Sequence, residues 1–241
     1  MIDLHCHILP ALDDGALDLA DSVAMAREAE RDGIAVVCAT PHIRDDHDVR
    51  IEELPDRIEA LQRELDRLGV GVRIAQGGEV AHFAADGLSA SHLRAVSLDG
   101  GGWILLEPAP GPIAEELPAL VERLAERGTR TIVAHPERHA GADFERYLRA
   151  LAASGCLLQW TADFIAQADP GDPDALVLRL AREGLVHLLA SDAHSSHGGR
   201  SMRLSPGFDR LREVCPPASV GWIAEEAPAA ILRGEPVAPP W

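Results

Sequence analysis

The sequence is poor in positive charge. Its 241 residues contain 22 basic side chains against 39 aspartates and glutamates, which gives a formal net charge of −17. A protein that binds the phosphate backbone of nucleic acid, or an anionic membrane surface, needs the opposite balance. We therefore expect neither nucleic acid nor a membrane surface as a partner. An acidic protein can still bind a single phosphate group if metal ions or a few arginines reverse the field locally.

Membrane and secretion signals are also missing. No run of about 18 apolar residues predicts a membrane-spanning helix. The chain opens on Ile2-Asp3-Leu4-His5 without a basic region or a long apolar segment, so no signal peptide is expected. The cysteines show no C-x-x-C spacing, and three of the four lie in apolar runs: Cys6, Cys38, Cys156 and Cys215. We expect buried, reduced thiols and a cytoplasmic protein, and we do not expect a cysteine-dependent phosphatase of the Cys-x5-Arg type.

Short apolar runs and helical patterns alternate along most of the chain. The runs predict buried strands, and apolar residues at every third or fourth position predict amphipathic helices. Strands are expected in the N-terminal run that carries His5 and His7 and at residues 34–40, 72–76, 103–107, 130–135, 156–161 and 186–191. Helices are expected at residues 17–31, 53–68, 115–127, 143–153 and 174–183, and from 208 toward 233. Residues 83–99 give no clear pattern.

This alternation predicts a parallel sheet with right-handed crossover connections. Seven strand–helix units without a linker or a short repeat suit one domain over residues 1–241. They favour a closed or nearly closed α/β barrel, and an open doubly wound sheet is the alternative. Neither G-x-G-x-x-G nor G-x-x-x-x-G-K-[ST] is present to favour a nucleotide-binding version of the open sheet.

Histidines or carboxylates follow six of the seven predicted strands. In a parallel α/β barrel all these strand ends meet at one face, where active sites are found. Alternate residues of a strand share a face, so the first two histidines should point the same way. The candidates are five histidines and four carboxylates: His5, His7, Asp14, His42, Glu79, Glu107, His135, Asp192 and His194. Mixed imidazole and carboxylate ligands suit Mn, Fe, Co or Zn, and nine of them predict three ions if one carboxylate bridges.

Two arginines directly follow candidate ligands. Arg138 stands in His135-Pro-Glu-Arg, and Arg200 lies six residues after His194. Planar guanidinium groups suit phosphate oxygens, so both are candidate substrate-binding residues. Charge balance on the surface of an acidic protein is the alternative.

The motifs and their order closely resemble the PHP (polymerase and histidinol phosphatase) superfamily. The resemblance is carried by His5-x-His7, Asp13-Asp14-Gly15, Thr40-Pro41-His42, Gly77-Gly78-Glu79, Leu106-Glu107, Ala134-His135-Pro136-Glu137-Arg138 and Ala190-Ser191-Asp192-Ala193-His194. It covers essentially the whole chain and is greatest for manganese-dependent protein-tyrosine phosphatases of bacterial capsule and exopolysaccharide clusters.

The resemblance implies a distorted (β/α)₇ TIM-like barrel with three divalent metal ions, manganese before iron, cobalt or zinc. One ion would take His5, His7, Glu79 and Asp192. A second would share Glu79 and take Glu107 and His135, and a third would take Asp14, His42 and His194. Arg138 and Arg200 would hold the phosphate, with Arg203 a competitor for the latter role. His42, His194 or a metal-bound water could supply the proton to the leaving group.

We therefore predict a metal-dependent phosphomonoester hydrolase, a protein-tyrosine phosphatase acting on a tyrosine-phosphorylated kinase of polysaccharide synthesis. Histidinol phosphatase or another small-molecule phosphoesterase of the superfamily is the alternative, and a non-catalytic metal-binding domain is a third. Two positions depart from the family, because relatives often carry an aromatic residue shortly after His42 and at His82. The residues Gln159-Trp-Thr-Ala-Asp163 of the sixth strand have no assigned role.

Overall fold

The fold is described by a computed structural model for residues 1–172 and 175–241. The strands of this part of the chain are short, and their bounds are β1 (Ile2–Cys6), β2 (Val36–Ala39), β3 (His42–Ile43), β4 (Arg73–Gln76), β5 (Glu79–Ala81), β6 (Trp103–Glu107), β7 (Arg130–Val133), β8 (Leu157–Thr161) and β9 (Leu188–Ala190). Each named pairing between them is parallel. The parallel sheet predicted from the alternating pattern is therefore confirmed.

The strands form two sheets, in the orders β1-β2-β4 and β3-β5-β6-β7-β8-β9. Two predicted strands end in the first sheet as β2 and β4, and each is followed at once by a short strand of the second sheet, β3 or β5, that was not predicted. Thr40-Pro41 separates β2 from β3, and Gly77-Gly78 separates β4 from β5. Proline has no backbone N–H for a ladder hydrogen bond, and a Cβ on Gly77 would lie 2.9 Å from side-chain atoms of Leu98 and Thr40. These residues break the ladder where His42 and Glu79 begin the next strand.

The end of β9 returns to the end of β1. The Asp192 N–H donates to the His5 carbonyl and the His7 N–H donates to the Ala193 carbonyl, both at 2.9 Å. Among the described residues the named strand pairings remain divided between two sheets and do not form one closed ring. The fold is thus a mixed α/β fold with parallel sheets.

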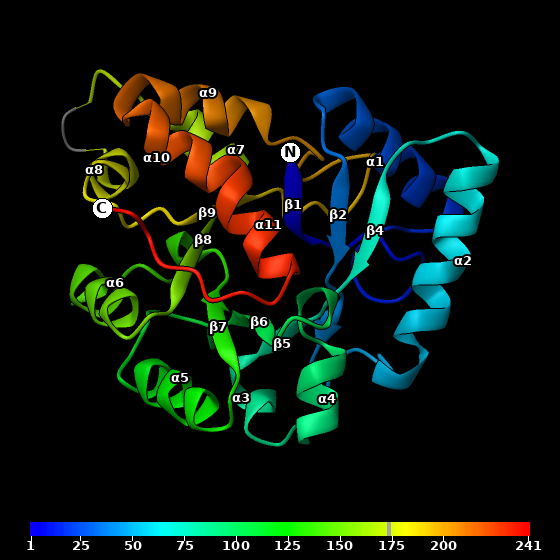
Figure 1. The fold of residues 1–241 in the computed structure, drawn as a ribbon, viewed down its shortest axis with the longest axis horizontal. Helices are drawn as coiled ribbons and strands as arrows, with labels where there is room; N and C mark the ends of the chain where they lie inside the picture. The colour runs from blue at the N-terminus through cyan, green and yellow to red at the C-terminus, as the bar shows by residue number, and fades with distance from the viewer. Residues whose placement is uncertain (173–174) are drawn as a thin grey trace.

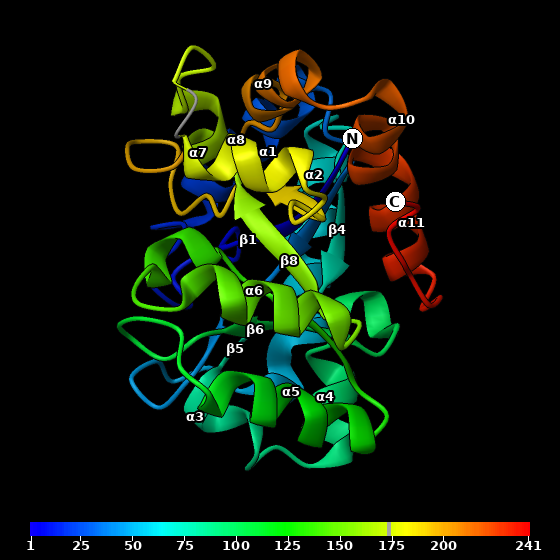
Figure 2. The same ribbon diagram turned by 90° about the vertical axis from the view of Figure 1, so that its left-hand side faces the viewer.

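Helices lie outside the strands and follow them in sequence. Their bounds are α1 (Leu19–Asp32), α2 (Leu54–Arg67), α3 (His82–Ala85), α4 (Ala90–Ala95), α5 (Glu116–Glu126), α6 (Phe144–Ala153), α7 (Ala162–Gln167), α8 (Leu176–Arg182), α9 (Ser205–Val214), α10 (Pro217–Gly221) and α11 (Ala227–Leu232). Short 3₁₀ turns cover Ile51–Glu53, Leu98–Gly100 and Pro136–His139, and a π-helical turn covers Trp222–Glu226. In Figure 1, α1 and α2 flank β2 and β4 on one side of the molecule. Figure 2 shows α5 and α6 on the outside of the later strands, where they pack on β7 and β8.

Most predicted elements are found within a few residues of their expected bounds. The patternless residues 83–99 contain most of α3 and all of α4, and α7 was not predicted at all. The predicted last helix is broken into α9, α10, the π-helical turn and α11. The predicted start of the fifth helix at Asp174 lies outside the described residues, and α8 begins at Leu176.

The C-terminal segment covers the amino-terminal ends of the strands. The indole N–H of Trp103 donates to the Glu235 carbonyl at 2.9 Å, and Arg130 donates to the Gly234 carbonyl at 2.7 Å. In Figure 1, α11 lies beside the start of β1, with which it is in contact. The opposite face, where the strands end, is left to the loops that carry the candidate ligands. No helix in the described part of the chain has the length and apolar character needed to cross a membrane.

Candidate metal centre

Two histidines of the N-terminal strand region point to the same side, as their alternation predicts. The Nε2 atoms of His5 and His7 lie 3.2 Å apart, and both side chains are fully buried. Asp13 orients His7, because its Oδ2 accepts from the His7 Nδ1 at 2.8 Å and from the His42 backbone N–H at 3.0 Å. Position 15 requires glycine, because a Cβ there would lie 2.2 Å from the His7 carbonyl oxygen. The Asp13-Asp14-Gly15 turn is thereby folded back onto His7.

Glu79 lies at the centre of the cluster. Its side chain is 1% exposed and begins β5, directly after the Gly77-Gly78 break. Four histidine rings face this one carboxylate, two from the end of β1 and one each from β3 and the segment after β7: His5 at 3.3 Å, His7 at 3.3 Å, His42 at 3.0 Å and His135 at 2.8 Å. Burial alone would raise the pKa of Glu79, but the His5, His135 and His42 rings outweigh it and hold that pKa well below its usual range. Glu79 is therefore an anion surrounded by imidazoles.

All nine predicted ligands come together in this structure. Their donor atoms form four overlapping groups, within each of which the atoms lie within 4.8 Å of one another: His7, Asp14, His42 and His194; His5, His135 and Asp192; His5, His7 and Glu79; and His42, Glu79 and Glu107. The grouping differs from the one that the resemblance implies. Here Glu107 lies beside His42, and His135 lies with His5 and Asp192.

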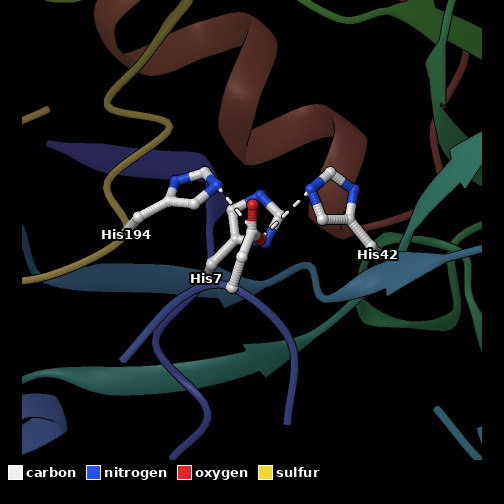
Figure 3. A group of neighbouring side chains, drawn as sticks. His7, His42 and His194 are labelled. Carbon is white, nitrogen blue, oxygen red and sulfur yellow. Dashed lines mark ion pairs between the residues drawn. The ribbon is translucent and has the colours of Figure 1, made fainter. Parts of the chain in front are cut away.

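The first of these groups is the most open to solvent. Figure 3 shows His7, His42 and His194 approaching one another from separate segments of the chain. Asp14, whose side chain is 53% exposed, lies 3.4 Å from His42 and 3.5 Å from His194. Hydrogen bonds with these two histidines lower the pKa of Asp14, so it is present as the carboxylate. This group forms the outer side of the centre, and the group around Glu79 forms the inner side.

Two of the candidate ligands have strained backbone conformations. His135 has φ of 27° and Asp192 has φ of 52°, both in the positive region that residues with a Cβ avoid. The backbone before Asp192 is held by the buried Asp3, which accepts from the Ser191 N–H at 3.1 Å and from the Ser191 hydroxyl at 2.5 Å. Burial raises the pKa of Asp3 to about 6. Strain of this kind collects at functional sites, where the surrounding structure fixes the conformation.

Several buried ligand-type atoms of this cluster make no hydrogen bond, and metal ions would satisfy them. Glu79 Oε2 and His42 Nδ1 are 3.0 Å apart. Within the described part of the chain, neither atom makes a hydrogen bond, and the buried His135 Nδ1 makes none either. Buried polar atoms without hydrogen bonds are rare and unfavourable. Divalent ions coordinated by imidazole and carboxylate would satisfy these atoms together.

Both predicted arginines reach the centre. Arg138 donates to Asp192 Oδ2, and Arg200 donates through Nε to the Asp192 carbonyl at 2.5 Å and contacts His194 Nδ1 at 2.7 Å. Arg203 points elsewhere, since its guanidinium lies 3.8 Å from Asp32 and its side chain is 51% exposed. The geometry therefore favours Arg200 over Arg203 as the second arginine of the site.

Gln159 contacts a candidate ligand, which the sequence did not predict. Its Oε1 lies 2.9 Å from His5 Nδ1, and the side chain is fully buried in β8. A partner on the second ring nitrogen fixes the tautomer and orientation of a metal-binding histidine. A polar residue in the middle of the apolar run Cys156-Leu-Leu-Gln-Trp was the available signal. The one predicted strand without a ligand thus supports a ligand on another strand.

The loop after β3 replaces the aromatic residue that relatives often carry. The His47 ring stacks on His42, with ring centroids 5.3 Å apart and planes inclined by 12°. Arg44 contacts Glu107 at 3.4 Å and is held by Asp46 through two hydrogen bonds. In α3, which directly follows β5, His82 is followed by the exposed Phe83. The aromatic ring beside His42 is therefore the imidazole of His47.

A cysteine-dependent site is excluded by the structure and not by the sequence. One Cys-x5-Arg spacing does occur, from Cys38 to Arg44. Cys38 is fully buried in β2, and burial raises the pKa of its thiol well above its usual value. The nucleophile of such enzymes is an accessible thiolate. All four cysteines are free and buried, which confirms the expectation of buried, reduced thiols.

The fold and the cluster define the class of protein: an α/β protein whose strands and loops gather histidines, carboxylates and arginines into a centre suited to metal ions. The chain belongs to the family described as capsular polysaccharide synthesis, CpsB/CapC, whose sequence model matches residues 1–233.

Named relatives agree with this membership. The chain is 32% identical over 200 residues to the tyrosine-protein phosphatase YwqE of Bacillus subtilis, covering 81% of this chain and 78% of that protein. It is 25% identical to the tyrosine-protein phosphatase CpsB of Streptococcus agalactiae serotype V, covering 81% and 83%. A solved structure from work on YwqE and CpsB of Streptococcus pneumoniae, described as metal-dependent tyrosine phosphatases, matches with a TM-score of 0.84, 28% identity and 99% of both chains covered.

The contact between Gln159 and His5 makes a first prediction. Gln159→Leu keeps the volume of the side chain but removes the partner of His5 Nδ1, so metal affinity should fall by about tenfold to a hundredfold. Metal binding is measured by competition with a chromogenic chelator. Gln167→Leu, on the exposed part of α7, is the matched control and should bind metal as the unaltered protein does. Unchanged affinity in Gln159→Leu would show that this hydrogen bond does not support the centre.

Proposed function

We propose that this protein is a metal-dependent protein-tyrosine phosphatase. The observation that carries the proposal is the joint presence of nine ligand-type side chains and two arginines in one cluster, in a chain of the CpsB/CapC family. The named relatives are tyrosine-protein phosphatases, and the matching structure is described as that of metal-dependent enzymes. The substrate we propose is a tyrosine-phosphorylated protein, in particular a kinase of polysaccharide synthesis.

We propose three divalent ions, with manganese the first choice. His5, His7, His135, Glu79 and Asp192 would hold the inner side of the centre, and Asp14, His42 and His194 would hold the outer side with Glu107 at its edge. Glu79 is the candidate bridge, because it is the carboxylate that histidines from both sides contact. When bound, such ions supply Lewis-acid chemistry, which activates water and stabilises charge on a phosphoryl group.

The arginines and the outer histidines have separate tasks in this proposal. Arg138 and Arg200 would bind the phosphoryl oxygens, because each extends over Asp192 with roughly a third of its side chain exposed. The tyrosyl oxygen has a pKa of about 10 and needs less help from an acid than an alkoxide does. His42 and His194, on the open side of the centre, are the side chains placed to deliver that proton.

The remaining proposals concern the domain organisation of the chain and its cellular compartment. We propose one domain over residues 1–241 in which the two sheets act together as a distorted (β/α)₇ barrel. Continuity through Thr40-Pro41 and Gly77-Gly78, and the hydrogen bonds from the end of β9 to β1, support that view. Four free, buried cysteines support a reducing compartment such as the cytoplasm.

The function is tested by a comparison of substrates on the purified, metal-loaded protein. The expected result is hydrolysis of a phosphotyrosine peptide with a kcat/KM well above that for histidinol phosphate. Excess EDTA should abolish both activities, and added Mn²⁺ should restore them. A preference for histidinol phosphate would identify a small-molecule phosphoesterase instead, and hydrolysis that persists in EDTA would contradict the metal dependence.

The arginines make a separate prediction. Arg138→Ala and Arg200→Ala should each lower kcat/KM for phosphotyrosine peptide by about tenfold to 150-fold, since a charge-assisted hydrogen bond is worth about 1.5–3 kcal/mol. Metal content should not change. Arg203→Ala is the matched control from the same loop and should have little effect, because its guanidinium faces Asp32. If Arg203 proved the most sensitive of the three, the assignment of Arg200 would be wrong.

A further inference from the structure

The loop that carries Arg200 is held by three aspartates from other segments. It connects β9 to α9, and residues 195–205, which run from this loop into the first residue of α9, contain four serines: Ser195, Ser196, Ser201 and Ser205. Every one of these serine hydroxyls donates to an aspartate carboxylate, and the aspartates are Asp21, Asp163 and Asp32. We call these three residues the carboxylate clamp. None of them belongs to the metal-ligand groups described above.

Asp21 joins the Arg200 loop to the loop after Asp14. It is 1% exposed and lies in the first turn of α1. Its Oδ2 accepts from the Leu17 N–H at 3.0 Å and from the Ser195 hydroxyl at 2.9 Å. Its Oδ1 accepts from the Ser196 N–H at 2.8 Å and hydroxyl at 2.6 Å. One carboxylate therefore fixes the two loops that bring Asp14 and His194 to the outer side of the centre.

Asp163 holds the residue directly after Arg200. It lies in α7, which follows β8, the strand that supplies no candidate ligand. Its Oδ2 accepts from the Ser201 N–H at 3.2 Å, and its Oδ1 lies 3.2 Å from the Ser201 hydroxyl. Further along the loop, Asp32 at the end of α1 accepts from the N–H groups of Leu204 and Ser205 at 2.7 and 2.9 Å. The loop is thus fixed on both sides of Arg200.

This arrangement determines where the Arg200 guanidinium can lie. Residues 195–205 include no regular element before α9, so no helix or strand ladder fixes the path of the backbone around Arg200. The side chain reaches Asp192 and His194 from a backbone that is fixed one residue later at Ser201. Misplacement of a substrate-binding group by about 1 Å can cost a hundredfold in rate. The position of the loop therefore matters as much as the charge of the arginine.

We propose that the carboxylate clamp positions Arg200 for phosphate binding, and that Asp163 is its principal positioning residue. The inference rests on the proposed function, because it assumes that Arg200 binds phosphate. It assigns a role to the Asp163 of the sixth predicted strand, which the sequence analysis left without one. It also explains why Arg203, on the far side of Ser201, is directed to Asp32 instead.

The direction in which Asp163→Ala changes phosphate affinity distinguishes a positioning role from a purely electrostatic effect of the Asp163 charge. Asp163 is an acidic residue near an anion-binding site, so loss of its negative charge alone should strengthen phosphate binding. If Asp163 acts through Arg200, Asp163→Ala should instead weaken the affinity of the metal-loaded protein for inorganic phosphate, by about tenfold or more. Phosphate affinity is measured by calorimetry at equal metal content, which requires no turnover.

The test is a double-mutant cycle with Asp163→Ala and Arg200→Ala. The expected result is non-additive: in the Arg200→Ala background, Asp163→Ala should have almost no further effect on phosphate affinity. Asp163→Asn keeps one acceptor oxygen for the Ser201 N–H and should recover part of the loss. Asp86→Ala, which removes an exposed carboxylate paired with Arg123, is the matched control and should leave affinity unchanged in both backgrounds.

Two outcomes would overturn the proposal. One is stronger phosphate binding in Asp163→Ala, and the other is an equal loss in the presence and absence of Arg200. If Asp163→Ala does not fold, the cycle is run with Ser201→Ala, which removes one donor to Asp163 and should give a smaller loss that again requires Arg200. Phosphotyrosine hydrolysis by the unaltered protein is measured separately, so its absence would contradict the proposed function, whereas additive losses would contradict the clamp alone.

Discussion

The structure depends on the burial of one carboxylate among four histidines. Glu79 is 1% exposed, and imidazole nitrogens of His5, His7, His42 and His135 lie 2.8–3.3 Å from its oxygens. A buried charge is tolerated only when partners or metal ions compensate it. The sheet is interrupted at Thr40-Pro41 and Gly77-Gly78, directly before His42 and Glu79. The backbone has positive φ angles at two further residues of the cluster, His135 and Asp192.

The charge distribution follows from the same constraint. The chain as a whole is strongly acidic, yet the candidate metal centre gathers five histidines and two arginines. Imidazoles surround the central carboxylate, and Arg138 and Arg200 both lie over Asp192. Bound divalent ions would be the largest charges in such a site and would reverse its local field. A strongly acidic chain is then compatible with phosphate binding at this centre.

The sequence predicted the parts of this protein that are set by local pattern. The apolar run that ends in a carboxylate predicted the observed bounds of β6, Trp103–Glu107. Runs of this kind, ended by histidine or carboxylate, also selected all nine residues that the structure brings together. The grouping of these nine could not be predicted, because which donors approach depends on how far each strand extends. His135 and Glu107 are the clearest examples: both lie beside Glu79 as the resemblance implies, but His135 also gathers with His5 and Asp192, and Glu107 with His42.

The remaining differences have tertiary causes. The short helix α7 and the segments between residues 82 and 100 are stabilised by packing and by individual hydrogen bonds more than by periodicity. Gln159 reaches His5 and Asp163 reaches Ser201 because β8 lies beside β9 and the end of β9 lies beside β1. Single residues of this kind leave little mark on a hydrophobic pattern, and their partners lie far away in sequence.

The central claim is that Glu79 joins several metal ions into one centre, and the most direct measurement is the number of ions bound per chain. Elemental analysis of the desalted protein, with hydrolysis of phosphotyrosine peptide measured on the same sample, should give two or three transition-metal ions in the unaltered chain. Glu79→Ala should lose metal and activity together. One ion or none in the active unaltered protein, or full metal content and full activity in Glu79→Ala, would contradict this account.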